Sequence, residues 1–261
     1  MKDLKILFIG DIFAQVGRNL VVKNLTSLID IHNVDFVVAN GENVTHGRSL
    51  SLWHYQTLQN AGINVFTMGN HTFFLKEAIS LVQEKKNIIR PANYSKLAPG
   101  RGSFVFNLKN YQIRITNLLG QTFMPQHVEN PFLLLDEIVQ KDESDFHFVD
   151  FHAEVTAEKI ALAWAFDGKI TGLLGTHTHV PTSDARLLPK GTFFVSDLGM
   201  TGPYDSIIGA KPEPIIHARR TNLPFRLIPA TGRGQFCAMV LTLDVKTKKV
   251  KTYQQIYQIF A

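Results

Sequence analysis

The sequence predicts a mixed α/β sandwich, and three observations support this fold class. In the first half of the chain, short apolar runs alternate with longer segments of helical periodicity, which is the pattern of parallel β-α-β units. In the middle, two alternating runs flank a short turn, as in an antiparallel hairpin. Hydrophobic residues make up 45% and charged residues 19% of the 261 positions. This balance supports a large core and excludes a disordered or collagen-like chain.

The first half contains three apolar runs that predict buried strands and three periodic segments that predict helices. The strands are expected at Leu4–Gly10, Asp35–Ala39 and Ile63–Met68, and the helices at about Arg18–Ile31, Ser49–Ala61 and Leu75–Lys85. A helix of this length gives the chain room to cross over between strands, so the three strands are expected to run parallel.

The second half is richer in strands. The hairpin is expected at Gly102–Leu108 and Gln112–Leu118 around Lys109-Asn110, further strands at Phe146–Phe151, Ile170–Gly175, Phe193–Ser196 and Gln235–Asp244, and one helix at Thr156–Phe166. Gly199–Gly209 contains three glycines and a proline, which predicts a long functional loop. No internal repeat or Ser/Gly linker divides the chain, so we expect one domain over residues 1–261.

Composition limits the location and the partners. The single cysteine, Cys237, excludes an internal disulfide and a multi-cysteine zinc site. The apolar run at 4–10 is too short for the core of a signal peptide, and no stretch approaches the roughly 18 apolar residues of a membrane helix. We therefore expect a cytoplasmic protein without a membrane partner. The net charge of +5 favours anionic ligands, but the basic residues are scattered, unlike those of a dedicated nucleic-acid surface.

Polar side chains follow five of the predicted strands at the point where each strand ends. The first strand leads to Asp11, the second to Asn40, Glu42 and Asn43, the third to Asn70 and His71, the next to His152, and the last to His177 and His179. Ligand sites of open α/β sheets lie at these carboxyl ends. Alternation in an extended segment would place His177 and His179 on the same side. Each residue alone also fits an ordinary cap, turn or core position. Their coincidence at five strand ends favours a site.

The donor set predicts a metal centre. It combines carboxylates, carboxamides and imidazoles without sulfur, which suits Mn, Fe or Zn better than Ca. The donors outnumber what one tetrahedral ion needs, so two ions are expected, with Glu42 as a reasonable bridge. Two ions about 3.5–4 Å apart would bind a phosphoryl group and activate water. Motifs of dinucleotide oxidoreductases, P-loop kinases, zincins and serine hydrolases are absent from the sequence.

The order of these motifs resembles the calcineurin-like metallophosphoesterases. The resemblance rests on Gly10-Asp11, Gly41-Glu42-Asn43, Gly69-Asn70-His71, His152 and Gly175-Thr-His177-Thr-His179. Asp150-Phe-His-Ala-Glu154 and Asp197-Leu-Gly-Met-Thr-Gly-Pro203 make it closer still to the YmdB-like bacterial phosphodiesterases. The resemblance implies an α/β fold in the form of a two-sheet αββα sandwich, with a dinuclear metal site at one edge.

The resemblance also implies a role for each candidate residue. One ion would be held by Asp11, Glu42, Asn43 and His179, and the other by Glu42, Asn70, His152 and His177, with Glu42 as the bridge. His71 would not bind metal but would stabilise the phosphoryl oxygens and protonate the leaving oxygen. The chain departs from the broad superfamily pattern, because Phe13 stands where that pattern has a histidine and Glu42 stands where it has an aspartate. The departure leaves the choice among Fe, Mn and Zn, and between divalent and mixed-valence ions, open.

These residues lead to one main functional hypothesis and two alternatives. The main hypothesis is a metal-dependent phosphodiesterase whose implied substrates are 2′,3′- or 3′,5′-cyclic nucleotides. A regulatory or RNA-associated protein that acts through partners is the first alternative, permitted by the positive charge and the glycine-rich loop. A nucleotide phosphomonoesterase that uses the same metals is the second. RNA association and homo-oligomer formation stay open at this point.

Overall fold

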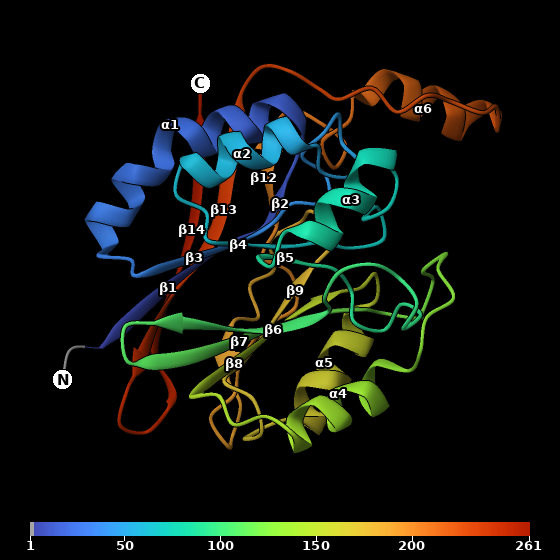
Figure 1. Cartoon of the computed structure of the whole chain (residues 1–261). Helices are drawn as coiled ribbons and strands as arrows, with labels where there is room; N and C mark the ends of the chain where they lie inside the picture. The colour runs from blue at the N-terminus through green and yellow to red at the C-terminus, as the bar shows by residue number, and fades with distance from the viewer. Residues whose placement is uncertain (1–2) are drawn as a thin grey trace.

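In the computed structural model, which describes residues 3–261, two β-sheets pack face to face and helices cover their outer faces (Figure 1). The first sheet has the order β2-β12-β13-β1-β3-β4-β5, with β14 paired to β13. Its strands are β1 (Leu4–Ile9), β2 (Asp11–Ile12), β3 (Phe36–Asn40), β4 (Val65–Thr67), β5 (Ile88–Ile89), β12 (Met200–Pro203), β13 (Gly234–Asp244) and β14 (Lys249–Phe260). The strands β1, β3 and β4 run parallel, as predicted, and β5, which the sequence analysis did not predict, continues the parallel arrangement.

The second sheet has the order β10-β11-β9-β8-β7-β6. Its strands are β6 (Ser103–Leu108), β7 (Tyr111–Leu119), β8 (Phe146–His152), β9 (Gly172–Thr176), β10 (Arg186–Leu187) and β11 (Phe193–Val195). The strands β6 and β7 form the predicted antiparallel hairpin, and Lys109 in its turn has a positive φ of 55°. The strands β7, β8 and β9 run parallel, so their carboxyl ends share one edge.

Six helices complete the described part of the chain. They are α1 (Ala14–His32), α2 (Leu52–Asn60), α3 (Lys76–Glu84), α4 (Pro131–Gln140), α5 (Thr156–Ala165) and α6 (Pro212–Thr221). The first three cover the outer face of the first sheet, and α4 and α5 cover the second sheet (Figure 1). None of the helices described for residues 3–261 combines the length and the hydrophobicity that a membrane span requires.

Strand β1 shows why these apolar runs lack polar alternation. Ile6 and Phe8 point into the core between the two sheets, whereas Leu7 and Ile9 point into the core under the helices. Because successive side chains of a strand alternate between its faces, a strand covered on both faces must be apolar throughout. The predicted two-sheet sandwich with flanking helices is confirmed.

Three sequence expectations need correction. Helix α1 begins at Ala14 rather than near Arg18. The segment Gly199–Gly209 is not a loop throughout, because β12 occupies its first part and pairs with β13 and β2. Helices α4 and α6 were not anticipated. The start of α4 was readable, since Asn130 caps the helix and a proline occupies the first turn.

Candidate functional site

All eight predicted site residues meet at one edge of the sandwich. The parallel strands β1, β3 and β4 bring their following loops to this edge from the first sheet, and β8 and β9 do so from the second. Each loop begins where an apolar strand ends, so the polar side chains leave the core together. The structure therefore brings the side chains that follow the predicted strands to one place, and their role as metal donors stays a prediction.

Four donors form one group, which we call the His152 cluster: Glu42, Asn70, His152 and His177. The Nε2 atom of His152 lies 3.1 Å from Glu42 Oε1 and 3.0 Å from Asn70 Oδ1. The Nδ1 atom of His177 lies 3.0 Å from the same nitrogen. The Glu42 and His152 side chains are fully buried, which is costly for ionisable groups unless partners use their charge.

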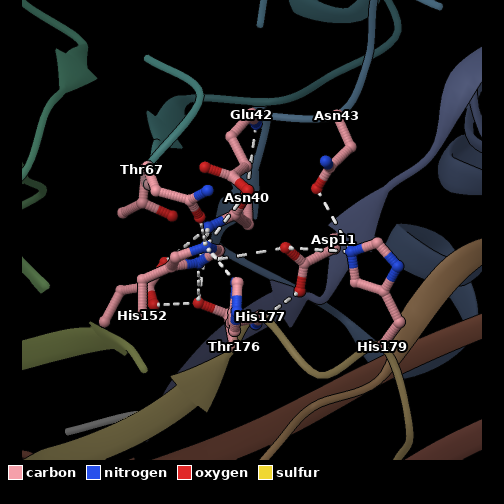
Figure 2. A network of polar contacts seen from close by, with 12 residues as sticks. Asp11, Asn40, Glu42, Asn43, Thr67, His152, Thr176, His177 and His179 are labelled. Atoms are coloured by element: carbon pink, nitrogen blue, oxygen red, sulfur yellow. Dashed lines mark hydrogen bonds and ion pairs between the residues drawn. The ribbon is translucent and has the colours of Figure 1, made fainter. Parts of the chain in front are cut away.

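Three donors form a second group, which we call the His179 cluster: Asp11, Asn43 and His179. The Nε2 atom of His179 lies 3.3 Å from Asn43 Oδ1 and 3.8 Å from Asp11 Oδ1. Figure 2 shows the Asp11 carboxylate between the His179 and His152 side chains. Its Oδ1 atom is 4.0 Å from His152 Nδ1, so the two clusters are adjacent.

The two histidines after β9 reach different clusters, which corrects the sequence argument. His177 and His179 have φ values of 103° and 67°, so the segment is not extended and side-chain alternation does not apply. The turn sends His177 to His152 and His179 to Asn43 (Figure 2). Non-glycine residues with positive φ are uncommon, and such strain is typical of functional sites.

Burial and mutual contact shift the pKa values of these groups. Burial would raise the pKa of Glu42, but the neighbouring His152 outweighs it and holds that pKa well below its ordinary value. Burial would lower the pKa of His152, but Glu42 outweighs it and raises the pKa to about 9. Burial raises the pKa of Asp11 to about 6 and lowers that of His177 to about 3. Without metal, the His152 ring is therefore protonated on both nitrogens and forms an ion pair with the Glu42 carboxylate.

A buried chain of hydrogen bonds through Thr176, Asp150 and Asn40 orients His152. The sequence analysis did not assign this orienting role to the three residues. Thr176 Oγ1 donates to Asp150 Oδ1 at 2.7 Å and therefore accepts from His152 Nδ1 at 2.8 Å. Asn40 Nδ2 donates to Asp150 Oδ2 at 3.2 Å. Such outer partners fix the ring so that Nε2 faces the cluster. Asp150 lies in the Asp-Phe-His motif two residues before His152, which was the available signal.

A fully buried ion pair supports the strained histidine turn. The ammonium group of Lys159 donates to Asp197 Oδ2 and to the Thr176 carbonyl, both at 2.9 Å. Asp197 Oδ2 also accepts from the Thr178 backbone N–H at 3.0 Å. The pair therefore connects helix α5 to the turn that carries His177 and His179.

Replacing Lys159 by Met should lower the free energy of unfolding by about 3–5 kcal/mol, because Asp197 would remain buried without its counter-ion. Urea titration measures this change. Lys169→Met is the matched control, since Lys169 forms an exposed pair with Asp136, and its effect should stay below about 1 kcal/mol. Equal effects of the two substitutions would contradict a supporting role for the buried pair.

A cavity of about 300 Å³ opens onto both clusters. It is lined by Phe13, Glu42, Asn43, Gly47, Arg48, His71, Glu154, His177, Thr178, His179, Ile208 and Leu227. His71 is partly exposed to this cavity, and its Nδ1 atom lies 3.2 Å from Glu42 Oε1 and 3.3 Å from Asn43 Nδ2. Its Nε2 atom has no hydrogen-bond partner among the residues that the structure describes.

Two observations indicate that the His152 and His179 clusters are suited to bind metal ions. Asp11 Oδ1 is buried and lacks a hydrogen-bond partner within residues 3–261, which is unfavourable unless a cation uses it. A side chain on Gly69 would lie 2.1 Å from Glu42 Oε2 and 2.4 Å from His152 Nε2, so this position keeps space free beside two donors. Binding would also release the proton from His152.

The chain is similar to several known proteins along nearly its whole length. It is 40% identical to the 2′,3′-cyclic-nucleotide 2′-phosphodiesterase of Bacillus subtilis, over 97% of this chain and 96% of that protein. A Mycoplasma pneumoniae protein, provisionally described as a phosphatase/phosphodiesterase, is 43% identical over 96% of this chain and 91% of its own length.

A solved structure agrees with these relatives. The crystal structure of a novel phosphatase from Mycoplasma pneumoniae superposes with a TM-score of 0.96 at 42% identity, over 100% of this chain and 95% of that chain. The predicted enzyme class, a phosphoric diester hydrolase, agrees with the descriptions of these relatives. The model of the YmdB-like protein family matches residues 7–256. The chain therefore belongs to the YmdB-like protein family, as its motifs predicted.

Proposed function

We propose that the chain is a metal-dependent phosphodiesterase that hydrolyses nucleoside cyclic phosphates, with the 2′,3′-cyclic form as the first candidate substrate. The observation that carries the proposal is the convergence of Glu42, Asn70 and His177 on Nε2 of His152 at 3.0–3.1 Å, beside a cavity. The name of the Bacillus subtilis relative supports the choice of substrate.

The donor clusters suggest how two ions would be held. Asp11, Glu42, Asn43 and His179 would bind one ion, and Glu42, Asn70, His152 and His177 the other. Glu42 would be shared, although its side-chain contacts in the structure go to His152 and His71. Oxygen and nitrogen donors of this kind suit iron or manganese, with zinc as a third candidate. Such ions would neutralise charge on the phosphoryl oxygens and activate water.

The chain's own residues would complete the reaction. His71 lines the cavity, and its unpartnered Nε2 would donate a proton to the departing oxygen. Arg48 lines the same cavity and adds a positive charge for the anionic substrate. Phe13, Ile208 and Leu227 form an apolar wall that would contact the nucleoside and exclude water.

Metal analysis and product analysis together test the proposal. Purified protein should contain close to two ions per chain and hydrolyse 2′,3′-cyclic AMP, but release no phosphate from 3′-AMP. Treatment with a chelator should abolish hydrolysis, and added Mn²⁺ should restore it. Phosphate release from 3′-AMP at a comparable rate would favour the phosphomonoesterase. Hydrolysis that is unaffected by the chelator would contradict a metal-dependent reaction.

The regulatory alternative predicts a different result for one substitution. Asp11→Asn removes a buried carboxylate of the His179 cluster. Under our proposal it should abolish hydrolysis. If the protein acts only by binding RNA or protein partners, the unsubstituted protein should show no hydrolysis. The Asp11→Asn variant should then bind the same partners as the unsubstituted protein.

A further inference from the structure

One exposed segment beside the site is positively charged. Residues 211–230, which we call the basic arm, comprise α6 and the irregular segment that follows it. Helix α6 projects away from the body of the molecule (Figure 1). Within the arm only Ala218 and Ala230 are buried. Most residues of the arm are therefore accessible to a partner.

The basic arm carries a large part of the chain's net charge. It contains four cations, Lys211, Arg219, Arg220 and Arg226, and one acid, Glu213, so its charge is 4 − 1 = +3 of the chain's +5. None of the four cationic side chains forms an ion pair with another described residue. Unpaired arginines on a projecting segment are typical of contacts with phosphate groups.

The arm also exposes apolar side chains among these cations. Leu223 and Phe225 are 57% and 48% exposed, and Arg226 follows Phe225 directly. Aromatic rings beside a positively charged track are the elements that bind single-stranded nucleic acid, because bases stack on the ring while cations contact the backbone. A second copy of this chain would bring an equally positive arm against this one, and like charges disfavour that pairing.

The base of the arm adjoins the candidate site. The Lys211 backbone N–H donates to the Ile228 carbonyl, and the Ala230 N–H donates to the Gly209 carbonyl, both at 2.8 Å. The Ile208 carbonyl accepts from His179 Nδ1 at 2.8 Å. Leu227 of the arm lines the cavity together with Ile208. A strand held by the arm would therefore have its end at the cavity.

The backbone at Ile208, where the base of the arm meets the cavity, is constrained by neighbouring contacts. Its φ is 46°, a left-handed conformation that is a genuine outlier for a β-branched residue. Such strain persists only where neighbouring contacts enforce it. Here it directs the Ile208 carbonyl to His179 while the side chain stays 52% exposed at the cavity.

We propose that the basic arm binds single-stranded RNA and directs its 3′ end, which carries a 2′,3′-cyclic phosphate, into the cavity. This inference rests on the proposed phosphodiesterase function. Water would add at phosphorus, the bond from phosphorus to O2′ would break, and O2′ would take up a proton, which leaves a 3′-phosphate on the strand. The reaction that supplies this substrate is RNA cleavage by attack of a 2′-hydroxyl on its own phosphodiester.

Binding of fluorescein-labelled octauridylate, followed by anisotropy between 50 and 200 mM KCl, tests the arm without turnover. The variant Arg219→Gln/Arg220→Gln/Arg226→Gln should bind on the order of 10-fold more weakly at low salt, and its salt slope should fall by about 2, since three phosphate contacts are lost. The control Lys23→Gln/Lys86→Gln/Lys96→Gln removes the same charge from exposed positions outside the arm and should bind nearly as wild type. Equal binding by all three proteins would overturn the inference.

Kinetics separate this inference from the proposed function. We compare kcat/KM for octauridylate ending in a 2′,3′-cyclic phosphate with kcat/KM for 2′,3′-cyclic UMP. The wild type should prefer the oligonucleotide, and the arm variant should lose this preference while its activity on the mononucleotide stays unchanged. If the wild type hydrolyses neither substrate, the proposed function fails, whereas the anisotropy result still stands. If the arm variant instead changes the oligomeric state and leaves RNA binding intact, the arm belongs to a second copy and the inference is wrong.

Discussion

Replacing Glu42 by Gln should remove much of the bound metal and reduce turnover at least 100-fold. Glu42 is 1% exposed, and its Oε1 atom lies 3.1 Å from His152 Nε2. In the proposed two-ion centre, a neutral amide would not offset the charge of the two ions. The metal affinity should therefore fall by more than the loss of about 10–100-fold that removal of an outer partner causes. Metal content per chain, measured on protein with an unchanged circular dichroism spectrum, gives the result.

Two further carboxylates provide graded controls for Glu42→Gln. Glu154 Oε2 lies 3.0 Å from His177 Nε2, so Glu154→Gln should weaken metal binding by about 10–100-fold at most, as expected for an outer partner. Glu143 is exposed and lies outside both clusters, so Glu143→Gln should change nothing. If Glu42→Gln kept two ions per chain and normal turnover, Glu42 would not be a shared ligand.

Replacing His71 by Ala should leave the metals bound but slow turnover by about 10²–10⁴-fold, which is the usual loss for a positioned general acid. His71 follows Asn70 but lies at the cavity, and of its two ring nitrogens only Nδ1 contacts Glu42 and Asn43. Its Nε2 therefore remains available to a substrate. Metal analysis and steady-state kinetics measure the two effects separately, and His127→Ala, at an exposed histidine outside both clusters, serves as the control.

The leaving group distinguishes two roles for His71. Bis-p-nitrophenyl phosphate releases a nitrophenolate that departs without a proton, so the loss in His71→Ala should be smaller on this substrate than on a cyclic nucleotide. Equal losses on both would mean that His71 acts as an electrostatic stabiliser. Loss of metal in this variant would show that the assignment of ligands and acid is wrong.

Local patterns of apolar and polar residues were sufficient to predict most of the helices and strands that form the core. The apolar runs of β1, β3 and β8 marked strands because both faces of these strands are covered. Patterns were insufficient for β12, whose residues Met200–Pro203 include glycine and proline and hold their place by pairing with β13 and β2. Helix α6 was missed because it is exposed and lacks a continuous apolar face.

The order of apolar strands and polar residues was enough to predict which side chains come together and at which edge of the sandwich they lie. Apolar strands lead to Asp11, Glu42 and His152 in turn, and parallel strands send their carboxyl ends to one edge. Which of these side chains touch one another depends on long-range packing. His177 and His179 separate because of positive φ values, and His152 meets Glu42 across the interface between two sheets. The contact between His152 and Glu42 joins residues more than 100 positions apart, so it depends on how the sheets pack, and no local pattern of residues encodes that packing.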